Sequence, residues 1–119
     1  MKGILCFGDS ITFGRGETPN KSWSGRLKEY FESKDFHNGV YNLGVPGHTS
    51  TDLLERFDSE AFGRIRTHRL GNEYLILIAI GTNDCKLDLI SEGSKPRITI
   101  EKFRENIKEL IKKAKCYKA

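Results

Sequence analysis

The sequence predicts an α/β fold built on a parallel sheet, because strand-like apolar runs alternate with amphipathic helical segments along the chain. Two of these runs, residues 3–7 and 73–80, lack the polar alternation of a half-exposed strand, which is typical of strands covered on both faces. Each run is followed by a glycine and polar residues, a turn signal. This order implies right-handed crossovers, with helices on both faces of the sheet.

The first half of the chain predicts two strands and two helices. Residues 3–7 indicate a central parallel strand, followed by a loop rich in Gly, Thr and Pro at residues 14–20. A helix with one buried face is expected next, from the spacing of Trp23, Leu27, Tyr30 and Phe31. Residues 40–43 predict a short second strand, and a helical period restarts at residues 49–57 through Leu53, Leu54 and Phe57.

The second half predicts one strand and one helix. Residues 73–80 are the most apolar segment of the chain, so this strand is expected to need cover on both faces. The last helix begins near Thr99, a good N-cap residue, although Lys102 stands where a capping box would have Glu. It is expected to run for about four turns. Its apolar face comprises Ile100, Phe103, Ile107, Leu110, Ile111 and Ala114.

The third strand is expected to lie at an edge of the sheet. In the doubly wound order the first strand sits between the second and the third, so the third has a free side unless a fourth strand pairs with it. Residues 74–80 carry no charge or proline that would protect such an edge. The sequence therefore predicts that this strand pairs with another copy of the chain or with the remainder of a longer polypeptide. No repeat or linker divides residues 1–119, which are expected to form one domain.

Charge and cysteine content exclude several classes of protein. The net charge of +4 comes from residues 100–119, which hold seven Lys or Arg against three Glu. Cations near a helix C-terminus oppose the helix dipole, and nucleic-acid binding would need a basic face interleaved with aromatic residues. The three cysteines, Cys6, Cys85 and Cys116, suit neither a disulfide framework nor a zinc site. With no export signal and no apolar run long enough to span a membrane, a cytoplasmic protein is expected.

The residues just after each strand point to an acyl-transfer site. Ligands bind outside the carboxyl ends of parallel strands, where this chain has residues 8–10, 44–48 and 81–84. Together these segments offer a hydroxyl, backbone N–H groups and a side-chain amide. Ser10 is the candidate nucleophile, with its own N–H, the N–H of Gly44 and the amide of Asn83 directed at a developing oxyanion. An ester is the expected small-molecule substrate, and no cofactor is needed.

These segments resemble the SGNH hydrolases, also called the G-D-S-L family of esterases and lipases. Residues 7–14 are similar to the family's first sequence block, residues 42–47 to its second and residues 81–84 to its third, in order and after the expected strands. The resemblance implies a flavodoxin-like, three-layer α/β/α fold with a parallel sheet. It also implies that Ser10 is the nucleophile and that Gly44 and Asn83 are oxyanion donors.

The chain departs from the family in its last block. Asp-x-x-His, which supplies the general base and the carboxylate that orients it, has no match, since Lys34, Val45 and Ile65 stand three places before the three histidines. The chain therefore resembles about the first two-thirds of a family domain, and a C-terminal truncation after the third strand and its helix is expected. The base would come from residues beyond Ala119 or from a second chain.

Simpler interpretations remain open for individual residues. Ser10 also suits a helix N-cap, Asp9 suits a support for the turn, and Asn83 suits a turn stabilised by its own side chain. His48 is the one histidine expected at the strand ends beside Ser10, yet a loop histidine is more often hydrogen-bonded locally. Asp84, Cys85 and Asp88 have no recognisable metal-ligand spacing, so no metal is expected.

Two other functions compete with ester hydrolysis. Without a base, the chain would be an inactive relative that binds an acyl ligand or a partner protein without turnover. A nucleotide-binding domain is the third hypothesis, with the loop at residues 8–16 around a phosphate. That loop lacks both phosphate-binding glycine motifs, and Asp9 would repel the ligand.

Overall fold

The computed structural model describes residues 1–19, 21–66, 69–88, 93 and 95–118. Its main sheet has three parallel strands, β1 (Lys2–Gly8), β2 (Gly39–Gly44) and β3 (Glu73–Ala79), in the order β2-β1-β3. The central position of β1 confirms the strand order expected from the sequence. Gly8 pairs with Gly44 on one side and with Ala79 on the other, so the three strands end at one edge.

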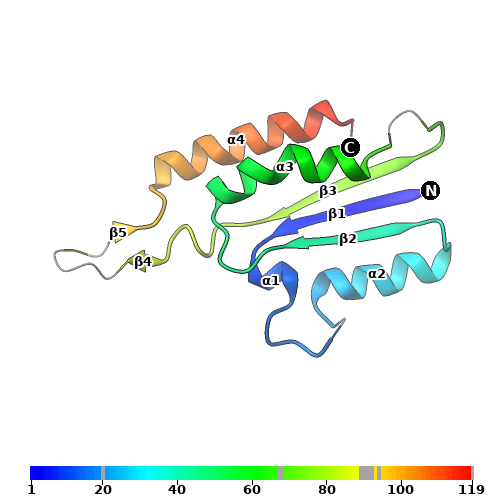
Figure 1. Ribbon diagram of the computed structural model, residues 1–119, viewed down its shortest axis with the longest axis horizontal. Helices are drawn as coiled ribbons and strands as arrows, with labels where there is room; N and C mark the ends of the chain where they lie inside the picture. The colour runs from blue at the N-terminus through cyan, green and yellow to red at the C-terminus, as the bar shows by residue number, and fades with distance from the viewer. Residues whose placement is uncertain (20, 67–68, 89–92, 94, 119) are drawn as a thin grey trace.

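Helices cover both faces of this sheet and make three layers (Figure 1). On one face, α2 (Trp23–Lys34) packs its apolar side chains against buried residues of β1 and β2. On the other, α3 (Ser50–Arg64) and α4 (Ile100–Cys116) lie side by side and enclose the larger core cluster. The predicted three-layer α/β/α arrangement is therefore confirmed.

The third strand is less covered than the sequence indicated. Leu75 of β3 pairs with Ile4 of β1 and so shares the face that α2 covers, yet 49% of Leu75 is exposed. Leu75 is exposed because α2 connects β1 to β2 and packs over those two strands, while α3 and α4 lie on the opposite face of the sheet. The expectation of cover on both faces is correct for β1 and wrong for β3.

Threonines cap the N-termini of α3 and α4, and of the two only Thr99 was predicted as a cap. Thr49 and Asp52 form a capping box at the start of α3, with the Thr49 N–H donating to Asp52 Oδ2 at 2.7 Å. The hydrogen bonds from Thr49 hold the pKa of Asp52 below its usual range. Thr99 Oγ1 accepts the N–H of Lys102 at 3.2 Å, which confirms Thr99 as the N-cap of α4. The helix α3 runs seven residues beyond its predicted limit because Ala61 continues its buried period.

Two predicted apolar faces are narrower in the structure. Leu110 of α4 is fully buried, but Ile100 and Ile111 are 55% and 47% exposed. Asn106, a polar residue that the prediction omitted, is 1% exposed at the centre of that face. Tyr30, expected on the buried face of α2, is exposed as well. These side chains lie at the edges of the buried helix faces, where no described element packs over them.

Three short elements were absent from the sequence interpretation. The single turn α1 (Ser10–Phe13) follows β1, and a two-stranded antiparallel hairpin of β4 (Leu87–Asp88) and β5 (Lys95–Pro96) precedes α4. Elements of two to four residues are too short to show a hydrophobic period. The hairpin projects from the sheet edge at which the parallel strands end (Figure 1).

Candidate active site

Ser10 occupies the first position of α1, directly after the central strand. Asp9 is buried and caps this turn, because its Oδ1 accepts the N–H of Ile11 at 2.9 Å. The turn closes at Gly14, whose φ of +90° lies in the left-handed region that glycine tolerates best. Ser10 itself is partly exposed, and among the described residues none forms a hydrogen bond with its hydroxyl. The hydroxyl is therefore held on a rigid turn without a base in contact.

Gly44 packs directly against the backbone of this turn. A Cβ atom at position 44 would lie 2.2 Å from the N of Phe13 and 2.7 Å from the carbonyl oxygen of Asp9. The N–H of Gly44 donates to Asn42 Oδ1 at 3.0 Å, and the amide of Asn42 donates to the Phe13 carbonyl at 3.2 Å. The structure thus brings Gly44 beside Ser10, with the Gly44 N–H held by a neighbouring side chain.

Asn83 lies in the turn after β3 and faces the loop between β2 and α3. Its Nδ2 donates to the carbonyl oxygen of His48 at 3.0 Å. A carboxamide nitrogen has two N–H donors, so this bond fixes the orientation of the Asn83 amide and leaves its second donor available. The three site residues predicted from the sequence therefore stand at the carboxyl ends of three adjacent strands.

Arg56 of α3 joins two of these strand ends and was not foreseen. Its Nη2 donates to the Gly8 carbonyl at 3.0 Å, and its Nε donates to His48 Nδ1 at 3.2 Å. Burial lowers the pKa of Arg56, an effect that Glu60 and Asp52 oppose, and an arginine remains a donor at any ordinary pH. His48 Nδ1 must then be the acceptor, so the neutral ring carries its proton on Nε2 and has no free nitrogen to take one from Ser10.

The other histidines lie away from Ser10 or outside the described residues. His37 lies in the loop before β2 and pairs with Asp35, its Nδ1 3.1 Å from Oδ1 of Asp35. This loop is at the opposite edge of the sheet from Ser10. His68 falls outside the described residues.

A buried polar network behind Asn83 also escaped the sequence analysis. Asp84, Ser50 and Asn106 are each at most 4% exposed. The Ser50 N–H donates to Asp84 Oδ2 at 2.9 Å, and the Ser50 hydroxyl forms a short hydrogen bond with Asp84 Oδ1. Asn106 Nδ2 donates to Ser50 Oγ at 2.9 Å. These hydrogen bonds hold the turn after β3 against α3 and α4. In the sequence, the only indication of the network is Asn106, a polar residue within the apolar face of the last helix.

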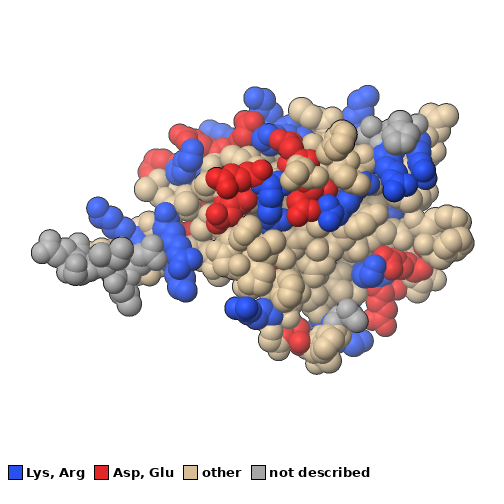
Figure 2. Space-filling view, in the orientation of Figure 1, with Lys and Arg blue, Asp and Glu red and all other residues tan. Residues whose placement is uncertain are grey.

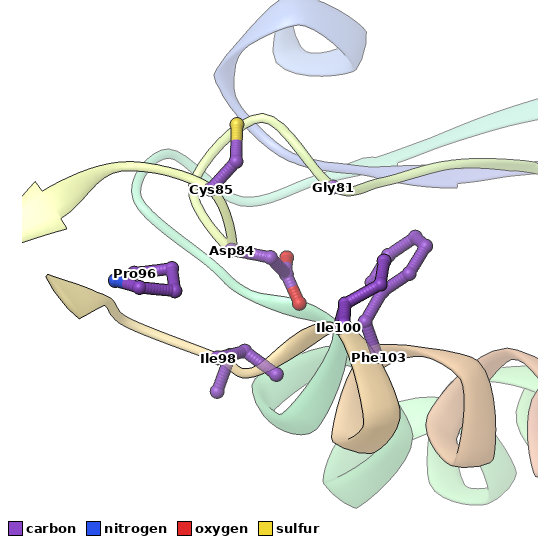
Figure 3. Close-up of a pocket in the computed structure, with 7 residues that line it drawn as sticks. All are labelled: Gly81, Asp84, Cys85, Pro96, Ile98, Ile100 and Phe103. Carbon is purple, nitrogen blue, oxygen red and sulfur yellow. The ribbon is translucent and has the colours of Figure 1, made fainter.

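An apolar cavity of about 320 Å³ lies on the α4 side of the same turn. Figure 3 shows side chains from the segment before α4 and from the start of α4 facing the turn that contains Asp84, with the Cys85 thiol directed away from them. The lining residues are Gly81, Asp84, Cys85, Pro96, Ile98, Ile100 and Phe103. Gly81 is needed here, since its φ of +134° is unfavourable for other residues and a Cβ would touch the Phe103 ring at 3.3 Å.

Within the described ranges, no three His, Cys, Asp or Glu side chains are grouped so that they could hold a metal ion. The same residues include no helix long and apolar enough to cross a membrane. All three cysteines are free, with Cys6 buried and the other two exposed.

Two solved esterases resemble this chain in fold, and one curated protein resembles it in sequence. AlinE4, whose crystal structure is described as that of an SGNH-hydrolase family esterase, matches 96% of this chain with a TM-score of 0.69 and 22% identity. The psychrotrophic esterase EstA from Pseudoalteromonas sp. matches 98% with a TM-score of 0.69 and 23% identity. The uncharacterized lipoprotein YqeF of Bacillus subtilis (strain 168) is 25% identical over 117 residues, 90% of this chain.

The chain spans only part of each of these proteins, 53% of AlinE4, 55% of EstA and 43% of YqeF. The likeness to the two solved esterases confirms the SGNH-hydrolase fold. The model of the GDSL-like lipase/acylhydrolase family matches residues 6–118, a range that includes Ser10, Gly44 and Asn83. The chain therefore belongs to the GDSL-like lipase/acylhydrolase family.

Proposed function

We propose that this chain carries the nucleophile and the oxyanion donors of a serine ester hydrolase. Ser10 is the nucleophile, and its own N–H, the Gly44 N–H and the Asn83 amide stabilise the oxyanion. The observation that carries the proposal is the meeting of three strand ends at one edge, with Gly44 against the turn that holds Ser10. Membership of a lipase/acylhydrolase family supports the same reaction class.

In the proposed reaction the Ser10 hydroxyl gives its proton to the general base, its Oγ bonds to the ester carbonyl carbon, and the carbonyl oxygen becomes an oxyanion. The intermediate then expels the alcohol, which takes up a proton, and leaves an acyl ester on Ser10 that water hydrolyses to the acid. For the Gly44 N–H to reach the oxyanion, it has to leave Asn42 Oδ1. Each such donor is typically worth about 2.7 to 4 kcal/mol in the transition state.

The general base lies outside the described residues in this proposal. Neither His48 nor His37 hydrogen-bonds to Ser10, and the Nδ1 of each has another partner. A longer polypeptide or a second chain has to supply the base, so this chain alone is expected to react slowly. In this proposal residues 1–119 form a single domain.

The apolar cavity beside the turn that carries Asn83 supports an ester with an apolar acyl or alcohol group as the substrate. Its wall is formed almost entirely by carbon atoms of the residues named above. Ligand sites combine such a lining with a few convergent polar groups, here supplied by the strand ends.

The test is covalent capture of Ser10 by a fluorophosphonate, followed by intact-mass spectrometry. The Ser10 oxygen forms a bond to phosphorus, fluoride leaves, and the serine proton passes to the base or to solvent. Because no base among the described residues contacts Ser10, we expect a single mass addition that appears slowly in the unchanged chain, and none in Ser10→Ala. EstA, a neighbour in fold, has been described as inhibited by monoethylphosphonate, which makes a phosphorus probe suitable.

Ser33→Ala is the matched control, because Ser33 is an exposed serine on α2, far from the carboxyl ends of the strands. Equal labelling of Ser10→Ala and the unchanged chain would contradict the nucleophile assignment. Absence of any labelling would favour the second candidate, a module that binds acyl ligands without turnover. This candidate is favoured by the hydrogen bond between the Gly44 N–H and Asn42, which keeps one proposed oxyanion donor engaged. NMR titration with a carboxylate or an uncleavable phosphonate would detect such binding.

We also propose that the free edge of β3 pairs with a strand of another polypeptide, either a second copy or the remainder of a longer chain. The strand β3 pairs on one side only among the described residues, and Leu75 is 49% exposed beside that free edge. Unpaired strand edges without charge favour association.

Light scattering is expected to show a mass that rises with protein concentration. Leu75→Lys should shift the protein toward the monomer, because a charge on an edge strand opposes pairing. Ile111→Lys, at a similarly exposed position on α4, should not. A single monomeric mass at every concentration would exclude pairing between copies.

A reducing, cytoplasmic compartment completes the proposal. It is supported by the three free cysteines, because disulfides are rare in such compartments. Burial raises the pKa of the Cys6 thiol to about 11, so Cys6 stays protonated and unreactive inside the core.

A further inference from the structure

The three most exposed large apolar side chains stand at the end of the molecule opposite the candidate active site. Leu70, Phe36 and Phe62 are 102%, 83% and 80% exposed, whereas no other large apolar side chain among the described residues exceeds 59%. A single exposed apolar residue is common on protein surfaces, but a group of them marks an interaction surface.

Backbone hydrogen bonds place Phe36 and Leu70 at the amino ends of the strands. Asn38, two residues after Phe36, accepts the N–H of Lys2 on its Oδ1 at 2.8 Å. Glu73, three residues after Leu70, donates its N–H to the carbonyl of the first residue at 3.1 Å. Both loops therefore flank the start of β1, while Ser10 follows its end.

The C-terminal ends of α3 and α4 reach the same end of the molecule (Figure 1). Phe62 lies in the last turn of α3, and just beyond it the N–H of Arg66 donates to the Tyr74 hydroxyl at the start of β3. At the end of α4, the Tyr117 hydroxyl is 3.2 Å from Oδ1 of Asp58, one turn before Phe62.

Unpaired cations accompany these apolar side chains. Arg66, Arg69, Lys115 and Lys118 are exposed, and none of them forms an ion pair within the described part of the chain. The carboxylates nearest in sequence to the three apolar residues, Asp35, Glu60 and Glu73, are paired with His37, Arg64 and Lys2. Figure 2 shows Lys and Arg atoms beside uncharged atoms at the end where the termini lie. We call Phe36, Phe62, Leu70 and these four cations the basal surface.

We propose that the basal surface docks on a lipid bilayer that contains anionic lipids. Exposed aromatic and aliphatic side chains insert at the headgroup boundary, and Lys and Arg bind anionic headgroups, each contributing about fivefold to the binding constant. The three apolar side chains project from separate segments with cations nearby. This suits a fluid, charged surface better than a protein partner, which needs a continuous desolvated core.

Docking in this way turns the candidate active site away from the bilayer. The carboxyl ends of the strands and the β4–β5 hairpin lie at the opposite end of the long axis (Figure 1), so substrates would arrive from solution. The proposal concerns a different surface from Ser10 and does not depend on ester hydrolysis.

Flotation of the full chain with vesicles tests this docking. Vesicles of phosphatidylcholine with phosphatidylglycerol are compared with pure phosphatidylcholine, each at low and at physiological salt. We expect flotation with the anionic vesicles only, weakened by salt because the Debye length shortens to about 8 Å at physiological ionic strength.

Two sets of variants locate the contact. Phe36→Ser, Phe62→Ser and Leu70→Ser combined should weaken binding at least about tenfold, and Arg69→Gln with Lys118→Gln about 25-fold. The matched controls are Leu87→Ser with Ile100→Ser, and Lys86→Gln with Lys95→Gln, exposed at the other end of the molecule.

Circular dichroism of each variant establishes that it is folded. Absence of flotation with anionic vesicles at low salt would overturn the proposal. So would equal flotation with neutral vesicles, or an equal loss of binding in the control variants. If the serine variants instead lower the mass measured by light scattering without vesicles, the basal surface is a contact between copies and the bilayer proposal is wrong.

Discussion

Replacing Asp84 by alanine is expected to lower the free energy of unfolding by about 3 kcal/mol or more. The Asp84 carboxylate is the acceptor for both the N–H and the hydroxyl of Ser50, and Ser50 is fully buried at the start of α3. Removing it leaves two buried donors without a partner, each at a typical cost of about 1 to 3 kcal/mol. Urea unfolding should show a lower midpoint with an unchanged slope.

Asp52→Ala is the matched control, because Asp52 is also a carboxylate at the N-terminus of α3 but is only partly buried. Both substitutions remove a negative charge from the positive end of the helix dipole, so that effect is common to them. The loss of the capping box should cost about 1 kcal/mol. An Asp84→Ala variant no less stable than Asp52→Ala would mean that the buried network contributes nothing specific.

Replacing Gly44 by alanine is expected to have the second large effect, lowering the free energy of unfolding by about 3 kcal/mol and abolishing the labelling of Ser10. The new Cβ would lie 2.2 Å from the Phe13 nitrogen and 2.7 Å from the Asp9 carbonyl oxygen. Both are backbone atoms, so no change of rotamer relieves the clash. The turn that holds Ser10 must move away from β2.

Gly63→Ala in α3 is the control, because a Cβ at position 63 meets no atom within 4 Å. Alanine in a helix is more favourable than glycine by about 0.5 to 1 kcal/mol, so this variant should be as stable as the parent or more stable. The measurements are urea unfolding and the amide NMR shifts of residues 9–13. If Gly44→Ala leaves both unchanged, the close approach of Gly44 to the Ser10 turn is wrong.

The strands and the position of the candidate site could be predicted because their signals are local. Residues 3–7 and 74–80 are uninterrupted apolar runs, and the turn residues Gly8, Gly44 and Gly81 follow or end the strands. Parallel pairing then brings the carboxyl ends of the strands to one edge without further information. This is why the positions of Ser10, Gly44 and Asn83 at one edge followed from the sequence, although their chemical roles stay predictions.

The contacts that hold these residues could not be predicted. Asp84, Ser50 and Asn106 are separated by 34 and 56 positions, and nothing in their local sequence indicates that they meet. The same holds for Arg56, which reaches Gly8 from 48 positions away and engages His48, the one histidine near the site among the described residues. The hydrogen bond between Asn42 and Gly44 spans two residues, yet it depends on a strand end whose geometry is set by the packing of α1 against β2.

The sequence by itself determined the order of strands and helices, the edge position of β3 and the lack of an Asp-x-x-His pair, because these follow from hydrophobic period, turn residues and spacing. The tertiary structure alone decided which polar groups are buried together, which face of β3 is left open and where the exposed apolar side chains gather. The physical reason is that period and turn chemistry act between neighbours in the chain, whereas burial and hydrogen-bond partners depend on which distant segments pack against one another.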